Sequence, residues 1–492
     1  MTYEWSRKES FLFFLVAVLV YVYPLILADY FYVEDSVRAA YGYASWGAEG
    51  RFLIDGFYHF LSLSNGVPDA FPLGLLVACV VMAVALQRLA FHYFDQVNVL
   101  SSMVVLPMFF SPLFLSGLAY KYDGPVMTVG GAMIVFAITL KTERKWVEWW
   151  GGGLLVGSAL CIYQPLINAF FGLCGIELYR AIKDKKPTRE WVVLGVEKAA
   201  QAGVASLFYL FAVVPFMSRE RQRLLALDED WPVVIFQRLE NAEERIRPLY
   251  TGDSAWFFGV MAILFLGGYA WTWFSALRER PRWVSKVLMS LAYLAIVPLM
   301  MVSVPGMMLV FFHENSDSRA MLGGGPLLVF IMLVIYQWLN ALQQKLTVFV
   351  VLPVILMLSI SYSYGRVLSL KRTLETNLMS SLAYSISSNA TLASVKIFYF
   401  NASAQDFWLP ASAGTVAIMP VMPYLVSADF LFLPEAMARV GITNVVKASH
   451  EHSAGVRLKR DALPIIDNLF YSIYLEDGDG YIVMKKQPRV NP

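Results

Sequence analysis

Charged side chains gather directly after the first apolar segment of the chain. Residues 11–28 carry no charge at all. The charged residues that follow include Asp29, Glu34, Asp35, Arg38 and Arg51. Charged groups at the rim of a membrane lose part of their hydration, which is costly, so their presence there points to a functional site. A carboxylate in this place can take a proton from a hydroxyl, and the cations can hold a phosphate group.

Two further charged clusters occur between later apolar segments. One is Tyr120-Lys121-Tyr122-Asp123, and the other comprises His313, Glu314, Asp317 and Arg319. If all three clusters lie on one side of the membrane, they can converge on a single pocket. Asp beside Arg or Lys at a membrane rim suits transfer of a sugar from a lipid-linked phosphate, with a carboxylate as the base and cations offsetting the charge of the leaving group.

Each cluster taken alone has a simpler explanation. An acidic loop after a membrane span is commonly a solvated loop. The Tyr and Trp side chains of residues 41–46 fit an interfacial aromatic belt as well as a platform for a sugar ring. Lys121 and Asp123 are two residues apart and could form an ordinary surface pair, which contributes little stability. Only the joint placement of the three clusters favours a site.

Composition places the chain among integral membrane proteins. It has 492 residues, 58% hydrophobic and only 15% charged, whereas a soluble protein has about 25% charged residues. The net charge of +2 gives no reason to expect a nucleic acid partner. Nothing in the sequence requires a metal ion or another cofactor.

The apolar segments predict about 11 transmembrane helices, because a helix needs roughly 20 apolar residues to cross the hydrocarbon core. The segment Trp149–Tyr179 is too long for one helix, and we divide it at Pro165, where the helical hydrogen bonds must break. The remaining windows are 11–28, 71–91, 99–118, 124–140, 199–217, 255–276, 283–304, 321–342 and 346–363. Alternate loops are rich in Lys and Arg, which predicts a cytoplasmic N-terminus and an external C-terminus.

We expect two domains. Residues 1–363 form the transmembrane domain, and residues 364–492 form a small exoplasmic α/β domain. In the second domain we predict strands at Val395–Phe400 and Gly480–Met484, a helix at Leu425–Val440 and a turn at residues 477–480. The predicted topology places the loop 218–254 outside, although the loop contains several arginines, which are expected on the cytoplasmic side. The loop also holds more carboxylates than arginines. It therefore predicts a salt-bridged surface helix.

The first charged loop resembles the opening external loop of the bacterial glucosyltransferase II family, the O-antigen-modifying enzymes carried by serotype-converting phages. That family has an acidic pair followed by an arginine, a Gly-Tyr, a Trp and a Gly-Arg. The matching residues are Glu34-Asp35, Arg38, Gly42-Tyr43, Trp46 and Gly50-Arg51. Glu34 replaces the usual Asp, so which carboxylate is the base stays open. Tyr120–Asp123 and Tyr163-Gln164-Pro165 are similar to two further motifs of the family.

The resemblance implies a GT-C-like enzyme of the bacterial inner membrane with its site on the periplasmic side. Such enzymes transfer glucose from undecaprenyl-phosphate glucose, which partner proteins make and flip, to the O-antigen of lipopolysaccharide. Some GT-C relatives use a divalent metal. Asp35 is the first candidate for the base, followed by Glu34 and Asp29. The candidates for binding the donor phosphate or the substrates are Arg38, Arg51, Lys121, Asp123, Tyr122, Trp46, Arg319 and His313.

Two other functions compete with this one. A transporter or lipid flippase would place polar groups or broken helices near the middle of the membrane, and Gln164-Pro165 with Asn168 is the one break in an apolar segment that has polar company. A non-catalytic assembly protein would only present the external domain. It predicts that the carboxylates near residue 35 can be neutralised without loss of function.

Overall fold

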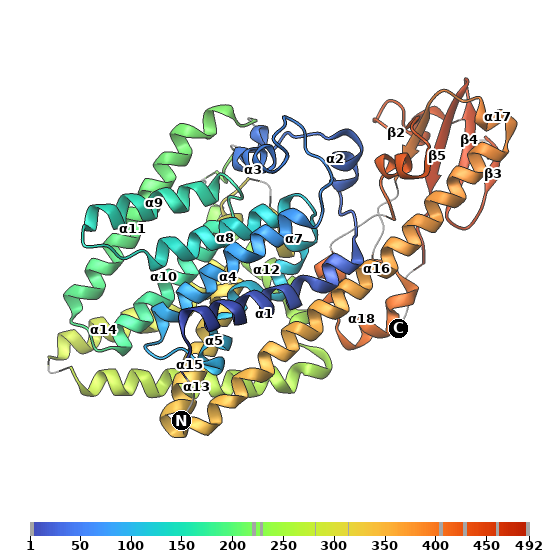
Figure 1. Cartoon of the computed structure of the whole chain (residues 1–492). Coiled ribbons are helices and arrows are strands. Elements are labelled where there is room, and N and C mark those ends of the chain that lie inside the picture. Colours follow the sequence, from blue (N-terminus) through green and yellow to red (C-terminus); the bar gives the residue numbers. More distant parts are fainter. Residues whose placement is uncertain are drawn as a thin grey trace.

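The computed structural model describes residues 4–218, 223–226, 230–280, 282–312, 314–402, 407–426, 431–458 and 462–488. This part of the chain is mostly helical, with a small sheet at one end (Figure 1). Eight helical segments within it are long and apolar enough to cross a membrane. The chain is therefore a membrane protein, as its composition predicts.

Helices occupy every window that the sequence predicts to be apolar, although the three helices α8, α9 and α10 are not among the eight segments of spanning length. The helices of the bundle are α1 (Arg7–Ala28), α4 (Leu73–Tyr93), α8 (Asp123–Thr139), α9 (Lys145–Leu160), α10 (Leu166–Lys183), α11 (Thr188–Ala212), α13 (Ala255–Arg278), α14 (Trp283–Ser303), α15 (Gly324–Leu342) and α16 (Val351–Ser388). Between them lie the shorter helices α2 (Asp35–Tyr41), α3 (Phe52–Ser62) and α12 (Trp231–Ile246).

Prolines divide two of the apolar segments. The predicted break at Pro165 is confirmed, because α9 ends at Leu160 and α10 begins at Leu166. The window 99–118, predicted as one helix, is instead a chain of short pieces: α5 (Val99–Val105), α6 (Pro107–Phe110), the 3-10 turn Pro112–Phe114 and α7 (Leu115–Ala119). Pro107 and Pro112 lack the N–H that a continuous helix needs, so the helix restarts at each of them.

Helix α16 is longer than predicted and runs beside α1 (Figure 1). It continues past residue 363, where we placed the domain boundary, because residues 366–388 contain neither Gly nor Pro. The two helices approach closely at Gly365, where an added Cβ would lie 2.6 Å from the Cβ of Pro24. In the same region the Ser361 hydroxyl donates to the carbonyl of Tyr21 at 2.7 Å. The first and the last long helix of the bundle are thus joined.

The C-terminal end of α16 carries the sheet. Its strands are β1 (Phe398–Asn401), β2 (Val445–Lys447), β3 (Ile466–Asp467), β4 (Tyr471–Glu476) and β5 (Asp479–Met484), in the order β2-β1-β5-β4-β3. β1 is parallel to both of its neighbours, and β3, β4 and β5 are antiparallel. Both predicted strands are confirmed. Leu378 and Leu382 of α16 pack in one core with Phe398 and Ile482 of the sheet.

Two local predictions for this region have opposite outcomes. Asp477-Gly478 forms the predicted turn, and both residues have positive φ angles, 53° and 88°, which suit a two-residue hairpin. The helix predicted at Leu425–Val440 is wrong. Residues 427–430 lie outside the described part, and the chain around them forms α19 (Met422–Val426) and the 3-10 helix η11 (Pro434–Val440).

The surface helix predicted within residues 218–254 is confirmed as α12. Glu243 of this helix pairs at 2.6 Å with Arg247, the residue that directly follows the helix. Arg238 has a different role: its buried guanidinium donates to the carbonyls of Leu309 at 2.9 Å and Phe312 at 3.1 Å. It therefore anchors α12 to the segment that leads from α14 to α15.

We expect Gly365→Ala to lower the melting temperature of the purified protein. The new methyl group meets the backbone of Pro24, and forcing atoms into a packed interface costs about 1–3 kcal/mol. Gly203→Ala is the matched control, because Gly203 lies in α11 with nothing within 4 Å of the added Cβ. Thermal unfolding in detergent measures both, and an equal melting temperature for the two variants would show that α1 and α16 are not tightly packed at Gly365.

Candidate active site

Asp35 joins two of the loops that the sequence predicts to converge. It begins α2 and is fully buried. Its Oδ2 accepts hydrogen bonds from the backbone N–H groups of Tyr32 at 2.9 Å and Lys121 at 3.0 Å. Its Oδ1 has no hydrogen-bond partner within the described part of the chain. Burial raises the pKa of the Asp35 carboxyl to about 8, against the opposing effect of the two amides.

Trp46 of the same loop is fully buried. The Arg38 guanidinium is 3.7 Å from the centre of the indole ring, and the ring of Tyr58 stacks on it at 5.9 Å. The indole N–H donates to Asp123 Oδ1 at 3.0 Å. Because Trp46 is 0% exposed, its ring offers no free face to a sugar in this arrangement. Its contacts instead fix Arg38 and Asp123.

Asp123 receives a second partner from the first loop. Arg51 lies 3.6 Å from Asp123 Oδ1 and 3.3 Å from Glu49, and its guanidinium also lies over the ring of Tyr163. Lys121 and Asp123 therefore do not form the surface pair considered above, since each has its own partner elsewhere. Charged residues of the first cluster therefore pair with charged residues of the second.

The third motif, Tyr163-Gln164-Pro165, also contacts the first charged loop. Gln164 donates to the carbonyl of Glu49 at 2.9 Å and to the Tyr209 hydroxyl at 2.7 Å. Asn168 donates to the carbonyl of Pro305 at 3.1 Å and accepts from the N–H of Met307 at 2.8 Å. The break at Pro165 thus lies at the end of the bundle that holds Asp35, and its polar side chains bind backbone groups and the Tyr209 hydroxyl.

Lys121 links the buried residues around Asp35 to the segment that directly follows α1. Its ammonium contacts Asp29 Oδ1 at 2.5 Å and lies 3.5 Å from the centre of the Phe31 ring. Arg372 of α16 contacts the other oxygen, Asp29 Oδ2, at 3.0 Å. Tyr122 is buried next to Lys121, and its carbonyl accepts from the Tyr58 hydroxyl at 2.8 Å.

The remaining predicted residues divide into three groups. Arg319 joins the site: its guanidinium lies 4.7 Å from the ring centre of Tyr120 and 3.6 Å from Asp317. Glu34 points outward, with 61% of its side chain exposed, and pairs with Arg38 at 3.7 Å. His313 lies outside the described residues, so its predicted role stays a prediction.

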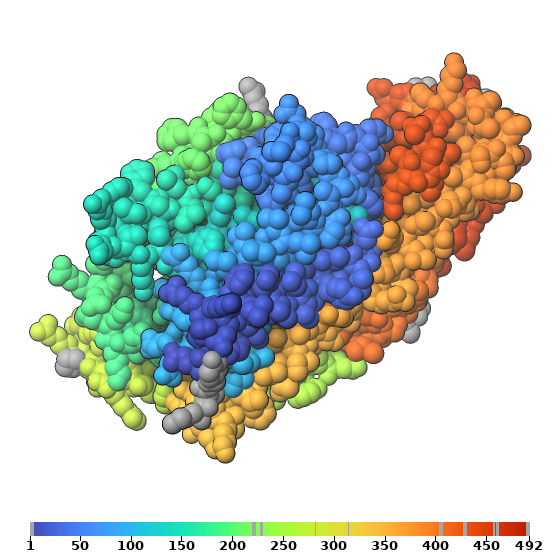
Figure 2. Space-filling model, viewed as in Figure 1, coloured from blue at the N-terminus to red at the C-terminus, as the bar shows by residue number. Residues whose placement is uncertain are grey.

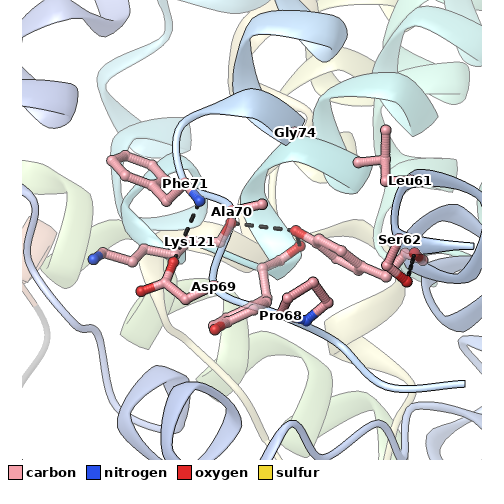
Figure 3. A pocket seen from close by; sticks show the side chains of 10 residues that line it. Leu61, Ser62, Pro68, Asp69, Ala70, Phe71, Gly74 and Lys121 are labelled. Carbon is pink, nitrogen blue, oxygen red and sulfur yellow. Dashed lines mark hydrogen bonds between the residues drawn. The ribbon is translucent and has the colours of Figure 1, made fainter. Parts of the chain in front are cut away.

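A small recess opens beside Lys121. Asp69, Phe71 and Tyr122 line it together with Lys121 (Figure 3). Asp69 is exposed, and its Oδ1 accepts from the N–H of Phe71 at 3.3 Å. In the described ranges no group of three His, Cys, Asp or Glu side chains is placed to hold a metal ion.

Sequence reasoning missed the residues that come from the C-terminal part. Arg372 lies in a stretch assigned to the external domain, and Arg439 of η11 lies over the Phe31 ring at 4.5 Å. The Tyr30 hydroxyl donates to Glu375 at 2.6 Å. A charged stripe on a helix such as α16 is the one sequence signal for these contacts, and it does not say which loop the stripe faces.

We expect the stability of the protein to fall as pH rises from about 5 to about 8, and to fall less in Asp35→Asn. The Asp35 carboxyl holds its proton more tightly when folded, with a pKa of about 8 instead of 3.8. Its contribution is therefore complete at low pH and is lost as pH rises toward the folded pKa. Asn keeps the two accepted hydrogen bonds but cannot ionise.

Melting temperatures of wild type, Asp35→Asn and Glu34→Gln across this pH range test the expectation. Glu34→Gln removes an exposed carboxylate of the same loop and should keep the slope of the wild type. An Asp35→Asn slope as steep as that of the wild type would show that Asp35 stays ionised in the folded protein.

Comparison with known proteins agrees with the motifs. A curated protein of Salmonella phage P22, described as "Uncharacterized 55.3 kDa protein in gtrB 5'region", is 26% identical over 157 residues, which make up 32% of this chain and 32% of that protein. The chain thus matches about a third of that relative's length. No solved structure matches the chain. The family model "Glucosyl transferase GtrII" matches residues 23–304, which hold all three motifs and more than half of the chain. The chain belongs to this glucosyltransferase family.

Proposed function

We propose that the protein transfers a glucosyl residue from a polyprenyl-phosphate donor to a hydroxyl of O-antigen or a related surface glycan. Undecaprenyl-phosphate glucose, made and flipped by other proteins, is the proposed donor. The family supports glucosyl transfer, and the apolar helices support a lipid-linked donor. We place the site on the periplasmic side of the inner membrane, with the N-terminus in the cytoplasm and residues 364–492 outside.

The position of Lys121 carries the proposal. Its backbone N–H holds the buried carboxylate of Asp35, and its ammonium reaches the rim at Asp29. Lys121 therefore connects the Asp35 carboxyl, which can accept a proton, with its own ammonium group, which can bind a phosphate. Glycosyl transfer from a lipid phosphate needs both functions within the length of one sugar.

In this reaction the oxygen of the acceptor hydroxyl attacks the anomeric carbon of glucose. The bond from that carbon to the phosphate oxygen breaks, and the polyprenyl phosphate leaves with the bonding electrons. We assign Asp35 as the base that takes the proton of the attacking hydroxyl, through the Oδ1 that the backbone amides leave unused. Because Asp35 is 0% exposed, this assignment requires the loops around it to open when the acceptor binds. A pKa near 8 gives this carboxylate a stronger pull on a proton than an ordinary Asp has.

The other two predicted bases are less suited to this role. Glu34 is mostly exposed and pairs with Arg38, so it points away from the buried centre. Asp29 is held between Lys121 and Arg372, and each of its two oxygens already contacts a cation.

The transporter alternative loses its main support. Gln164 and Asn168, the polar residues at the break in the bundle, bind backbone groups of neighbouring segments. The break also lies at the end of the bundle that holds the charged clusters, whereas a transport site is expected near the middle of the membrane.

We expect Asp35→Asn to lower the rate of glucosyl transfer by roughly 10²–10⁴-fold, the usual loss when a general base is removed. The wild-type rate should rise between about pH 6 and about pH 8, as the base ionises. The assay supplies undecaprenyl-phosphate glucose and O-antigen polysaccharide to purified protein and measures glucose in the polysaccharide.

Asp95→Asn is the control for this experiment, because Asp95 is an exposed carboxylate between α4 and α5, at the opposite end of the bundle. It should retain the wild-type rate. Full transfer by Asp35→Asn would exclude Asp35 as the base, and absence of transfer by the wild type with this donor would contradict the proposed reaction.

A further inference from the structure

Three cations from distant parts of the chain surround the end of α1. Lys121 precedes α8, Arg372 lies on α16 and Arg439 lies in η11. Lys121 and Arg372 each contact one oxygen of Asp29, at 2.5 Å and 3.0 Å. Lys121 and Arg439 both lie over the Phe31 ring, at 3.5 Å and 4.5 Å from its centre. We call Lys121, Arg372 and Arg439 the rim cations.

The rim cations exceed the negative charge beside them. Asp29 is the carboxylate that contacts them directly. The nearby Glu375 accepts from the Tyr30 hydroxyl at 2.6 Å, pairs with Lys371 at 3.4 Å and also interacts electrostatically with Arg439. Even with Glu375 included, the cations around the end of α1 outnumber the carboxylates. The group therefore suits a further anion.

Two of the rim cations, Arg372 and Arg439, are also reachable from outside, whereas the side chain of Lys121 is only 3% exposed. The side chains of Asp29 and Arg372 are 40% and 39% exposed, and Arg439 is exposed as well. Asp29 directly follows the apolar helix α1, so it lies at the depth where a lipid carries its head group. Figure 2 shows the blue surface of the residues after α1 next to the orange and red surface of the C-terminal part.

We propose that the rim cations bind the phosphate of the lipid-linked sugar donor, and that Asp29 is the counter-ion which this phosphate displaces. The proposal rests on the function proposed above and adds the C-terminal part of the chain to the active site. Arg372 and Arg439 lie beyond residues 23–304, the segment that matches the family. During transfer the phosphate gains negative charge, and cations already in place stabilise that charge.

The site differs from the one expected from the sequence. Arg38 and Arg51 were candidates for the donor phosphate, but their guanidinium groups lie over Trp46 and Tyr163 and pair with carboxylates of the first and second clusters. In this proposal they hold the loops around Asp35, and the phosphate lies at the other end of the Lys121 side chain.

Binding of undecaprenyl phosphate to the purified protein tests the proposal. This ligand lacks the sugar, so the result does not depend on which sugar is transferred or to which acceptor. Arg372→Gln and Arg439→Gln should each raise the Kd roughly ten- to hundredfold, since a hydrogen bond to a charged group contributes about 1.5–3 kcal/mol. Arg366→Gln, an exposed arginine of α16, should keep the wild-type Kd.

Asp29→Asn separates phosphate binding from a merely structural salt bridge. Asp29 has a φ of 44°, a conformation that Asn accepts, so the variant should fold. If Asp29 competes with the phosphate, Asp29→Asn should lower the Kd several-fold. If Arg372 only holds the loop through Asp29, then Asp29→Asn should weaken binding as Arg372→Gln does, and this result would overturn the proposal.

A soluble phosphate ester identifies the source of the phosphate. Glucose 1-phosphate shares the phosphate but has no lipid tail, so it should displace undecaprenyl phosphate only at millimolar concentration. Displacement at the concentration of the lipid itself would show a site for a free phosphate ester and would contradict the lipid donor. Failure of the proposed function alone would leave the undecaprenyl phosphate binding and the effects of Arg372→Gln unchanged.

Discussion

The arrangement of the end of the bundle that holds the charged clusters depends on one buried carboxyl. Asp35 receives two backbone N–H groups, one from the loop after α1 and one from the loop before α8. Backbone donors cannot be replaced by side-chain mutation, and a buried N–H without an acceptor is costly. The two loops are therefore fixed to each other through Asp35. This connection also positions Trp46, Asp123 and Lys121.

Pairing also explains how charged groups are accommodated beside the apolar helices. Asp123 is held by Trp46 and Arg51, and Asp29 is held by Lys121 and Arg372. Buried or half-buried charges are stable only when they are paired and hydrogen-bonded. Asp35 is the exception, because its two bonds come from neutral amides and do not offset its burial. Burial without a cation at contact distance therefore raises the pKa of the Asp35 carboxyl.

The sequence predicted the helices, the broken segment at Pro165 and the meeting of the first loop with residues 120–123. These features follow from apolar length, proline chemistry and the exclusion of charge from lipid. It did not predict which charges would pair. Lys121 is two residues from Asp123 but contacts Asp29, and Arg51 contacts Asp123, because loop conformation decides side-chain partners. Arg372 and Arg439 were missed for a related reason: α16 runs unbroken past the assumed boundary, and only its packing against α1 brings the C-terminal part to the rim.

Helix α16 has 38 residues, which at about 1.5 Å per residue is longer than the roughly 30 Å of a hydrocarbon core. Its first half is held against α1 at Gly365, and its far end is built into the core of the sheet. A continuous helix resists bending, so the sheet and the lipid-level half behave as two ends of one stiff rod. A force applied to the sheet by a long polymer would be transmitted along this rod to Arg372, nearly at its midpoint, without passing through any flexible linker.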